Sequence, residues 1–180
     1  MGAQAAPGDL EHVRAFVNTL DVETGTDELA EPASLAAWLR SRGLLQGASA
    51  TSADAAGARR LREALRALLL ENNGVSVRKE AAVTLNRAAR EAALELRFDL
   101  EGGVRLEPGA RGVAGALGRV LAIVAAAMED GTWSRLKACR ADDCTWAFYD
   151  HARNRSRHWC SMAVCGNRTK ARAYRRRHAA

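Results

Sequence analysis

A chain of 180 residues with 48% hydrophobic and 27% charged residues has the composition of a folded protein, which excludes an intrinsically disordered one. Its net charge of +6 is unevenly distributed, because residues 135–180 carry 12 basic and 3 acidic side chains, a local net charge of +9. The remaining residues hold 15 basic and 18 acidic side chains, a net of −3, so we expect a polyanionic partner for the C-terminal part alone.

The N-terminal residues predict two helices separated by a polar loop. Asp9 is a candidate N-cap for a helix with apolar residues spaced up to Leu20, and residues 21–31 are expected to form a loop. Ser34 is expected to cap a short helix that Gly43 ends. The start of the chain lacks a basic stretch followed by an apolar run, so we expect no secretory signal and a cytoplasmic, nucleoid-associated protein with reduced cysteines.

Two further helices are expected in the middle of the chain. The first follows a Gly/Ala/Ser-rich linker at residues 46–51, carries leucines on one face and arginines on the other, and ends at Asn72-Asn73-Gly74. The second begins at Ser76 and runs to about residue 94.

After Leu94 the period of the apolar residues changes from 3.6 to 2. Apolar and charged side chains alternate as far as Gly102-Gly103, which provides a turn, and a return strand begins at Val104. This pattern predicts a β-hairpin near residues 94–107. A lone hairpin is marginally stable in water, so it needs a covering element on its apolar face.

The apolar segment 111–129 is the expected cover for the hairpin. It contains the longest weakly charged stretch of the chain, which is rich in alanine and glycine and has Arg119 in its middle. That stretch is too short to span a membrane comfortably. We therefore expect a buried helix and no membrane partner.

Six residues of the N-terminal region are hypothesised to line a pocket for a small-molecule effector. They lie at the end of the first helix, where packing does not require polar groups, and on later helices, and clefts between helices are a common location for small ligands. The alternative is that the first group caps a helix end and that the arginines are solvated. The residues are Asn18, Thr19, Trp38, Arg62, Arg66 and Asn86.

All four cysteines lie in one short segment with the pattern C-x4-C-x15-C-x4-C: Cys139, Cys144, Cys160 and Cys165. Two short-spaced pairs on separate turns supply the thiolate tetrahedron that zinc requires, so we predict a structural Zn2+ site. Two disulfides, or four unrelated buried cysteines, are the alternatives. Because four protein ligands leave no open position for water, a catalytic metal is not expected, and His151 and His158 are expected to be surface groups.

Arginine dominates the surface expected around these cysteines, with 10 Arg and 2 Lys from residue 135 onward. Arginine forks suit phosphate oxygens and guanine edges, so we expect nucleic-acid binding, mainly at phosphates, with a solvated charged face as the alternative. The candidate residues lie in a turn before Trp159 and in a helix after the last cysteine: Arg153, Arg155, Arg157, Asn167, Arg168, Lys170, Arg172, Arg175, Arg176 and Arg177.

Several other residues of this segment have expected structural roles. Ala171 and Tyr174 are expected to dock onto the zinc core, and Trp146 and Trp159 to pack within the module, with stacking on single-stranded bases as the alternative for both tryptophans. Gly166 is expected to adopt a positive φ and Asn167 to cap the following helix. Whether Asn167 and Arg168 contact DNA or brace the finger is left open by the sequence.

The segment from Trp159 to Arg168 resembles the CGNR zinc-finger family, named for the tetrapeptide Cys165-Gly166-Asn167-Arg168. The match covers roughly residues 133–178. Upstream, Phe16-Val-Asn-Thr-Leu-Asp21, Trp38-Leu and the leucine-rich helix resemble the ABATE-like N-terminal domain of bacterial stress-induced transcription regulators. The resemblance implies a bacterial, zinc-dependent DNA-binding regulator.

The fold class expected from these patterns is mainly α with one β-hairpin (α+β), followed by a small C-terminal four-cysteine zinc-finger module. We place a helical regulatory or sensing domain at residues 1–132 and the zinc finger with its basic C-terminal helix at residues 133–180. DNA is the expected partner, and a small-molecule effector and a homodimer are hypothesised.

Other functional classes are weighed against this prediction. An RNA-binding or protein-docking zinc finger is the alternative. A small-molecule-binding enzyme is the further class considered, but the chain has no P-loop, no G-x-S-x-G and no H-E-x-x-H motif, so we expect no enzyme.

Overall fold

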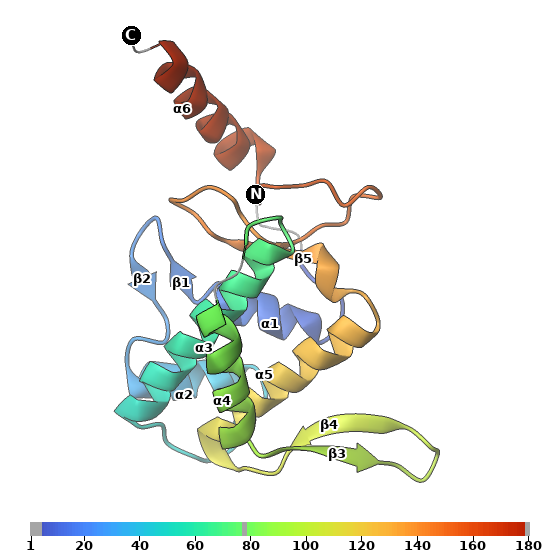
Figure 1. Cartoon of the computed structure of the whole chain (residues 1–180). Coiled ribbons are helices and arrows are strands. Elements are labelled where there is room, and N and C mark those ends of the chain that lie inside the picture. The colour runs from blue at the N-terminus through green and yellow to red at the C-terminus, as the bar shows by residue number, and fades with distance from the viewer. Residues whose placement is uncertain (1–4, 77–78, 179–180) are drawn as a thin grey trace.

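Helices and short antiparallel strand pairs make up the protein in the computed structural model, which describes residues 5–76 and 79–178 (Figure 1). The predicted class, mainly α with β-hairpin structure and a C-terminal cysteine module, is confirmed. In chain order the elements are α1 (Leu10–Val17), β1 (Leu20–Asp21), β2 (Thr26–Asp27), α2 (Pro32–Ser41), α3 (Ser52–Glu71), α4 (Lys79–Glu91), β3 (Leu94–Phe98), β4 (Val104–Pro108), α5 (Gly112–Glu129), the 3-10 turn η1 (Trp133–Arg135), β5 (Leu136–Ala138), β6 (Ala147–Tyr149), the π-helical turn η2 (Met162–Gly166) and α6 (Asn167–His178).

The core of the N-terminal body lies where α1, α3 and α5 meet. Phe16 of α1, Leu65 of α3 and Val120 of α5 are completely buried. Burial of an apolar side chain of this size contributes about 1.5–3 kcal/mol, so these contacts hold the three helices together. At the start of α3, Thr51 and Asp54 form a capping box, in which each side chain accepts a hydrogen bond from the backbone N–H of the other.

α5 is the most apolar helix of the body. By length and composition alone it could cross a membrane. Nine of its 18 residues are nevertheless buried within the body. Gly118 permits the close approach of two neighbouring segments, because a Cβ at this position would lie 2.6 Å from the Cβ of Ala92 and 2.9 Å from that of Pro108. This packing is that of a core helix, as predicted.

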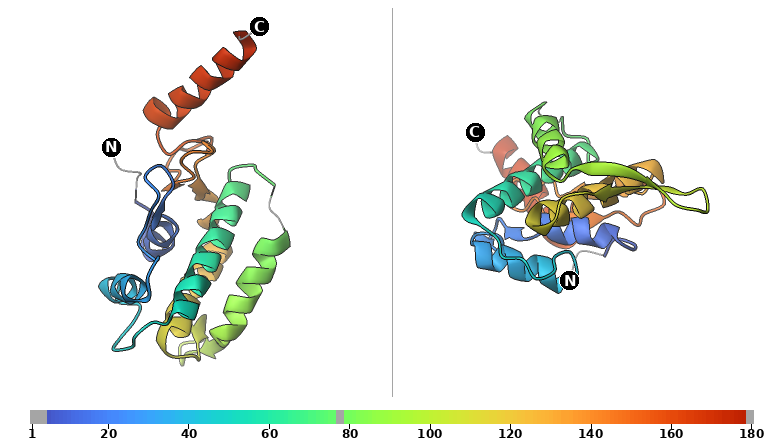
Figure 2. Two further views of the ribbon diagram at one scale, coloured as in Figure 1. Left: turned by 90° about the vertical axis from the view of Figure 1, so that its left-hand side faces the viewer. Right: turned by 90° about the horizontal axis from the view of Figure 1, so that it is seen from below.

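The β3–β4 hairpin has the predicted register but not the predicted cover. Phe98 pairs with Val104, and the turn between them contains Gly102 with a φ of +85°. α5 packs against the base of the hairpin, whereas its strands run on beyond the body (Figures 1 and 2). Leu96 and Phe98 are therefore 62% and 78% exposed. The prediction that the 111–129 helix covers the apolar face is correct at the base and wrong toward the tip.

The segment after α1 folds differently from the predicted loop. α1 ends at Val17, and Leu20, predicted as the last apolar residue of that helix, pairs with Asp27 between the two-residue strands β1 and β2. Ser34, the predicted cap of the next helix, lies inside α2. That helix starts at Pro32, because a first helical position tolerates a residue without an N–H.

The two middle helices also differ from prediction in detail. Arg62 and Arg66, predicted on the face of α3 opposite to its leucines, are buried, because α3 packs against α4 as well as against α1 and α2. The predicted helix start at Ser76 leads into residues 77–78, which lie outside the described residues. α4 is described from Lys79 and ends at Glu91.

β5 and β6 form an antiparallel pair that shares the core of the body. β5 packs against α3 and β6 against α1, and Leu136, Ala138, Ala147 and Tyr149 belong to the same apolar cluster as the helices. The core therefore continues across the predicted boundary at residue 132. α6, by contrast, projects away from the body at the end opposite to the β3–β4 hairpin (Figures 1 and 2).

Candidate metal centre and basic surface

Four cysteine Sγ atoms converge between the β5–β6 pair and α6. Cys139 directly follows β5, Cys144 ends a turn in which its N–H donates to the carbonyl of Ala141 (2.9 Å), and Cys165 lies in η2. Cys160 follows the loop that leaves β6. The four Sγ atoms all lie within 4.8 Å of one another, and that of Cys160 is 3.6 Å from those of Cys144 and Cys165. The structure thus brings together the four predicted ligands.

This arrangement fits a tetrahedral zinc ion. Thiolates about 2.3 Å from zinc lie about 3.8 Å apart at the corners of a tetrahedron, close to the two separations of 3.6 Å. All four cysteines are free thiols, so the disulfide alternative does not describe this structure. Because the four side chains would fill the tetrahedron, the site suits an ion that holds the fold rather than one that activates water.

The crowded thiols shift one another's pKa values. Hydrogen bonds from Cys144 and Cys160 lower the pKa of Cys139 to about 2, and the same thiolate raises the pKa of Cys144 to about 12 and also raises that of Cys160. One thiolate therefore forms readily, while Cys144 and Cys160 resist ionisation unless a cation compensates their charge. A divalent ion would supply that compensation and would release protons on binding.

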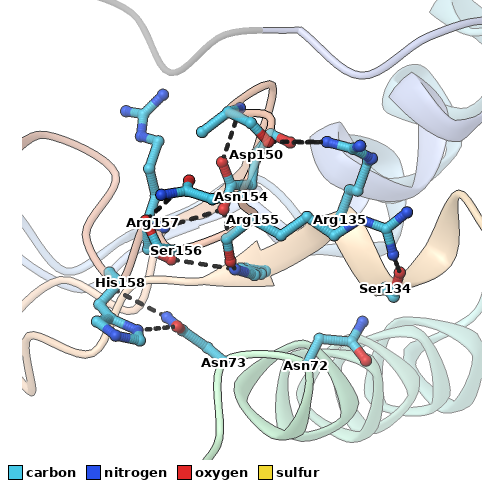
Figure 3. Close-up of polar contacts among 12 residues, drawn as sticks. Asn72, Asn73, Ser134, Arg135, Asp150, Asn154, Arg155, Ser156, Arg157 and His158 are labelled. Atoms are coloured by element: carbon cyan, nitrogen blue, oxygen red, sulfur yellow. Dashed lines mark hydrogen bonds and ion pairs between the residues drawn. The ribbon is translucent and has the colours of Figure 1, made fainter.

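A buried ion pair holds the loop that joins β6 to the second cysteine pair. Lys137 Nζ lies 2.9 Å from a carboxylate oxygen of Asp150, and the two side chains are 4% and 0% exposed. Lys137 also donates to the carbonyls of Arg155 and Arg157. Asp150 accepts from the N–H of Arg157 at 3.0 Å (Figure 3). Burial alone would raise the pKa of Asp150, but the Lys137 ammonium and the backbone donors outweigh burial and lower it.

Asn73, at the end of α3, attaches the finger to the body. Its Nδ2 donates to the carbonyl of Ala138 at 2.7 Å. The same atom donates to the carbonyl of His158 at 2.9 Å, and Oδ1 of Asn73 lies 2.8 Å from Nδ1 of His158 (Figure 3). Its own carbonyl accepts from Arg140 Nε at 2.6 Å. The adjacent Asn72 donates to two carbonyls in η1 and β5. The helix end predicted here is confirmed, because α3 ends at Glu71. His158, predicted as a surface group, is instead half-buried and bound by Asn73.

Asn18 attaches the finger on the side of α1. Its Nδ2 donates to the carbonyl of Ala147 at 2.9 Å, and its Oδ1 accepts from the N–H of the same residue at 2.7 Å. The amide therefore pairs with β6 much as another strand would. Asn18 was hypothesised to line an effector pocket, but in this structure both of its polar atoms are used to join α1 to the finger.

Three other residues hypothesised for that pocket take part in one internal polar network. Arg62 forms a bidentate ion pair with Asp27 at 2.6 and 2.9 Å and donates to the hydroxyl of Thr19 at 3.3 Å. Arg66 donates to the carbonyl of Val17 at 2.6 Å. These contacts tie α3 to the end of α1 and to β2.

The remaining two residues of the hypothesised pocket lie apart from that network. Trp38 packs against Phe16 with ring centroids 5.6 Å apart, and Asn86 is exposed on α4. Three cavities of the described residues, of about 630, 800 and 570 Å³, are lined by other residues. Effector binding at the six positions stays a prediction to which this geometry adds no support.

The basic helix α6 stands free of the core, and none of its residues is buried (Figure 1). Arg168, in its first turn, lies 3.0 Å from a carboxylate oxygen of Glu23, 3.3 Å from one of Asp143 and 3.8 Å from the Sγ of Cys165. Arg172 lies 2.6 Å from Asp143. The two arginines in the first half of α6 therefore face negative groups of the protein itself.

The other predicted nucleic-acid residues divide between exposed and bound positions. Arg153 is exposed in the loop after β6, whereas Arg155 donates to the hydroxyl of Ser134 (3.1 Å) and Arg157 donates to the carbonyl of Cys160 (3.0 Å). Within the described residues no ion pair involves the other four lysine and arginine side chains of α6. These are Lys170, Arg175, Arg176 and Arg177.

The CGNR tetrapeptide has a different local geometry from the one predicted. Gly166 does not adopt a positive φ; it lies in η2, where a Cβ would be 2.5 Å from the Sδ of Met162. A Cβ here would displace only the Met162 side chain, which is flexible and 45% exposed, so packing alone does not require glycine. Asn167 donates from Nδ2 to the carbonyl of Ala163 at 3.2 Å, so it closes η2 and does not cap α6.

The aromatic residues of the module are placed partly as predicted. Trp159 packs against the cysteine cluster, and Trp146 is half-buried at the start of β6. Tyr174 does not dock onto the metal site: it is 58% exposed and stacks on His178 with ring centroids 4.1 Å apart, and Ala171 is exposed as well. α6 is therefore supported by the finger only at its first turns.

Two family models match the chain. Residues 12–131 match ABATE, described as "Putative stress-induced transcription regulator", and residues 135–178 match zf-CGNR, described as "CGNR zinc finger". No curated protein matches the chain. The two resemblances seen in the sequence are confirmed, and the second covers the segment that holds the four converging cysteines.

Proposed function

The chain belongs to the ABATE family of transcription regulators and carries a CGNR zinc finger, and from this premise we propose that it is a zinc-dependent DNA-binding transcription regulator. In this proposal zinc is structural, and α6 is the element that contacts DNA. The N-terminal body serves in effector sensing or dimerisation. We assign the chain no enzymatic activity, because the four thiolates would leave no position for a substrate on the metal.

The observation that carries the proposal is an unsupported helix of high positive charge. α6 has 12 residues, of which none is buried, and six of them are lysine or arginine. An isolated helix of this length is marginal in water, and like charges on successive turns destabilise it further. A polyanion removes that repulsion. Its length of about 18 Å suits a major groove, which is wide enough to admit a helix.

The contacts divide the arginines into two groups. Arg168 and Arg172 are paired with protein carboxylates and fix the direction in which α6 leaves the finger. The distal cations of α6, which include Arg176 and Arg177, are free to bind phosphates. Most of the binding energy is then electrostatic and independent of sequence, and it decreases with salt.

The proposal is tested by fluorescence anisotropy of a labelled DNA duplex with the zinc-loaded chain over a series of salt concentrations. Each lost phosphate contact decreases the magnitude of the slope of log affinity against log salt by about 0.9. We expect Arg176→Ala and Arg177→Ala each to do so. The matched control is Arg97→Ala, an exposed arginine of the hairpin at the opposite end of the molecule, which should leave the slope unchanged.

The partner class and the role of zinc are tested in the same assay. Cys160→Ser should abolish binding, because it removes one metal ligand and with it the support of α6. Genome-wide recovery of bound DNA, compared between the wild-type chain and Cys160→Ser, identifies the sites. Preference for RNA over duplex DNA would support the RNA-binding alternative, and the absence of salt-dependent binding to either would overturn the proposal.

A further inference from the structure

We propose that the β3–β4 hairpin is the dimerisation arm of this protein: the apolar tip of each hairpin inserts into the groove between the hairpin and α5 of a second copy. This inference rests on the proposed function and deepens it, because it assigns the dimerisation proposed for the N-terminal body to one element; its test needs no DNA, so it can fail while DNA binding stands. Figures 1 and 2 show the hairpin extending from the body at the end opposite to α6.

The hairpin has one apolar face and one charged face. Cross-strand partners lie on the same side of a sheet, and here the apolar pairs alternate with pairs of charged residues. The apolar pairs are Leu94 with Pro108, Leu96 with Leu106, and Phe98 with Val104. A two-stranded sheet also leaves the outer edge of both strands without a neighbouring strand. A hairpin of this kind is stable only when its apolar face is buried, and within this chain that burial is incomplete.

The exposed part of that face is large. Leu96, Phe98 and Val104 are 62%, 78% and 52% exposed, and Leu100 at the tip is fully exposed. Together these side chains present apolar surface on the order of 500 Å², as much as the largest patch of a typical monomer. With the wall of the groove added, the surface is on the order of 600 Å², the lower end of the roughly 600–1,000 Å² per partner that a specific interface buries.

The tip is an ordered turn and not a loose loop. Asp99 accepts hydrogen bonds from the N–H of Gly103 (2.7 Å) and of Glu101 (3.0 Å), and its own N–H donates to the carbonyl of Gly103 (3.0 Å). Leu100 is therefore held outward by the turn. An ordered apolar projection loses little conformational entropy when it inserts into a partner.

A receiving groove lies beside the base of the same hairpin. It has a volume of about 630 Å³, and its apolar walls come from the inner face of the hairpin, at Leu96 and Leu106, and from α5, at Ile123 and Ala126. Projection and groove lie on one face of one chain, so a two-fold axis can place each tip in the groove of the other copy. Such a self-complementary contact closes on itself as a dimer.

A second copy fits this surface better than a membrane does. Asp99 and Glu101 flank the exposed Leu100, and carboxylates at the tip disfavour insertion into anionic lipid. The dimer contact also leaves α6 uncovered in both copies, because that helix projects from the opposite end of each body (Figure 1).

The test is sedimentation velocity of the zinc-loaded full-length chain, without DNA, at concentrations up to about 100 μM. We expect the wild-type chain to form a dimer. Phe98→Lys alters the tip and Ala126→Glu alters the groove, and each should raise the dimer Kd at least about 100-fold, because a two-fold interface repeats the defect twice. The matched control is Val83→Lys, which charges an apolar side chain 67% exposed on α4, and it should dimerise as the wild type does.

Mixing the two variants distinguishes tip-in-groove contact from other modes of association. In an equimolar mixture of Phe98→Lys and Ala126→Glu, one contact joins the lysine tip to the glutamate groove and the other is wild type, so a heterodimer should form again. Circular dichroism confirms that each variant is folded. A monomeric wild type, variants that dimerise normally, folded variants that stay monomeric when mixed, or a monomer that binds anionic vesicles would each overturn the proposal.

Discussion

Arg168 is the residue at which the metal site, the body and the basic helix meet. Its guanidinium reaches Glu23 in the turn between β1 and β2, Asp143 between the first two cysteines, and the Sγ of Cys165. A cation placed against a thiolate stabilises the ligand set without binding the metal. The sequence left open whether this arginine contacts DNA or braces the finger, and these contacts favour bracing.

Arg168→Ala should therefore weaken zinc retention. We expect zinc affinity to fall by about 10-fold to 100-fold, as removal of outer partners of metal ligands usually does, because Cys165 loses its neighbouring cation. Competition with a chromophoric chelator measures this change. Arg176→Ala is the matched control and should leave zinc affinity unchanged. Normal zinc affinity combined with lost DNA binding would instead assign Arg168 to the DNA contact.

The ion pair between Lys137 and Asp150 should be among the most sensitive points of the finger. Lys137→Met leaves a fully buried carboxylate without its cation, and breaking a buried pair in this way costs about 3–5 kcal/mol. Asp150→Asn keeps one acceptor for the backbone N–H groups and should cost less. Urea unfolding of the zinc-loaded protein measures both, with the exposed Arg153→Ala as the control near zero. Equal losses for the control and for Lys137→Met would contradict this assignment.

At the scale of elements, the long periodic segments were predictable and the short ones were not. α3, α5 and the β3–β4 hairpin have unbroken periods of 3.6 or 2, and the structure has all three near their predicted places. β1 and β2 have two residues each, too few for any period to show.

The ligand set of the metal site was also predictable, because two cysteine pairs constrain one another through spacing alone. The attachment of the finger was not predictable. Asn73 follows α3 as an ordinary residue at a helix end does. Its side chain nevertheless binds Ala138 and His158, which lie 65 and 85 positions further along the chain. No local pattern encodes such partners. The same limit explains Arg62 and Arg66, which a helical wheel places opposite the leucines but which packing on several sides of α3 buries.

α6 should be only partly folded in the absence of DNA. It packs against little beyond η2, and its charges repel one another. In hydrogen exchange we expect the amides of its distal half to exchange almost as fast as an unfolded peptide, and to become protected when duplex DNA is added. α5 is the internal control, since its buried amides should be protected in both states. Equal, strong protection of α6 without DNA would show that the helix needs no polyanion.

At the scale of the whole molecule, the finger and the body share one core but differ in what holds them. β5 and β6 contribute fully buried Leu136, Ala147 and Phe148, and Asn18 and Asn73 bind their backbone from the body. The cysteine segments beyond these strands rest on a small cluster of Cys139, Ala141 and Cys165. Their order must therefore depend chiefly on the metal.

Removal of zinc by a strong chelator should consequently unfold the protein in part, along a boundary different from the one drawn from sequence. The sequence placed the whole of residues 133–180 in the zinc-finger module, which would make that entire segment depend on the metal. Because β6 lies inside that range but is packed in the body, we expect it to stay folded, while the cysteine turns and α6 lose their amide protection. Hydrogen exchange resolved by residue, with and without chelator, measures this. Readdition of zinc should restore protection, whereas loss of protection in β6 and α5 together would mean that metal and core form one cooperative unit.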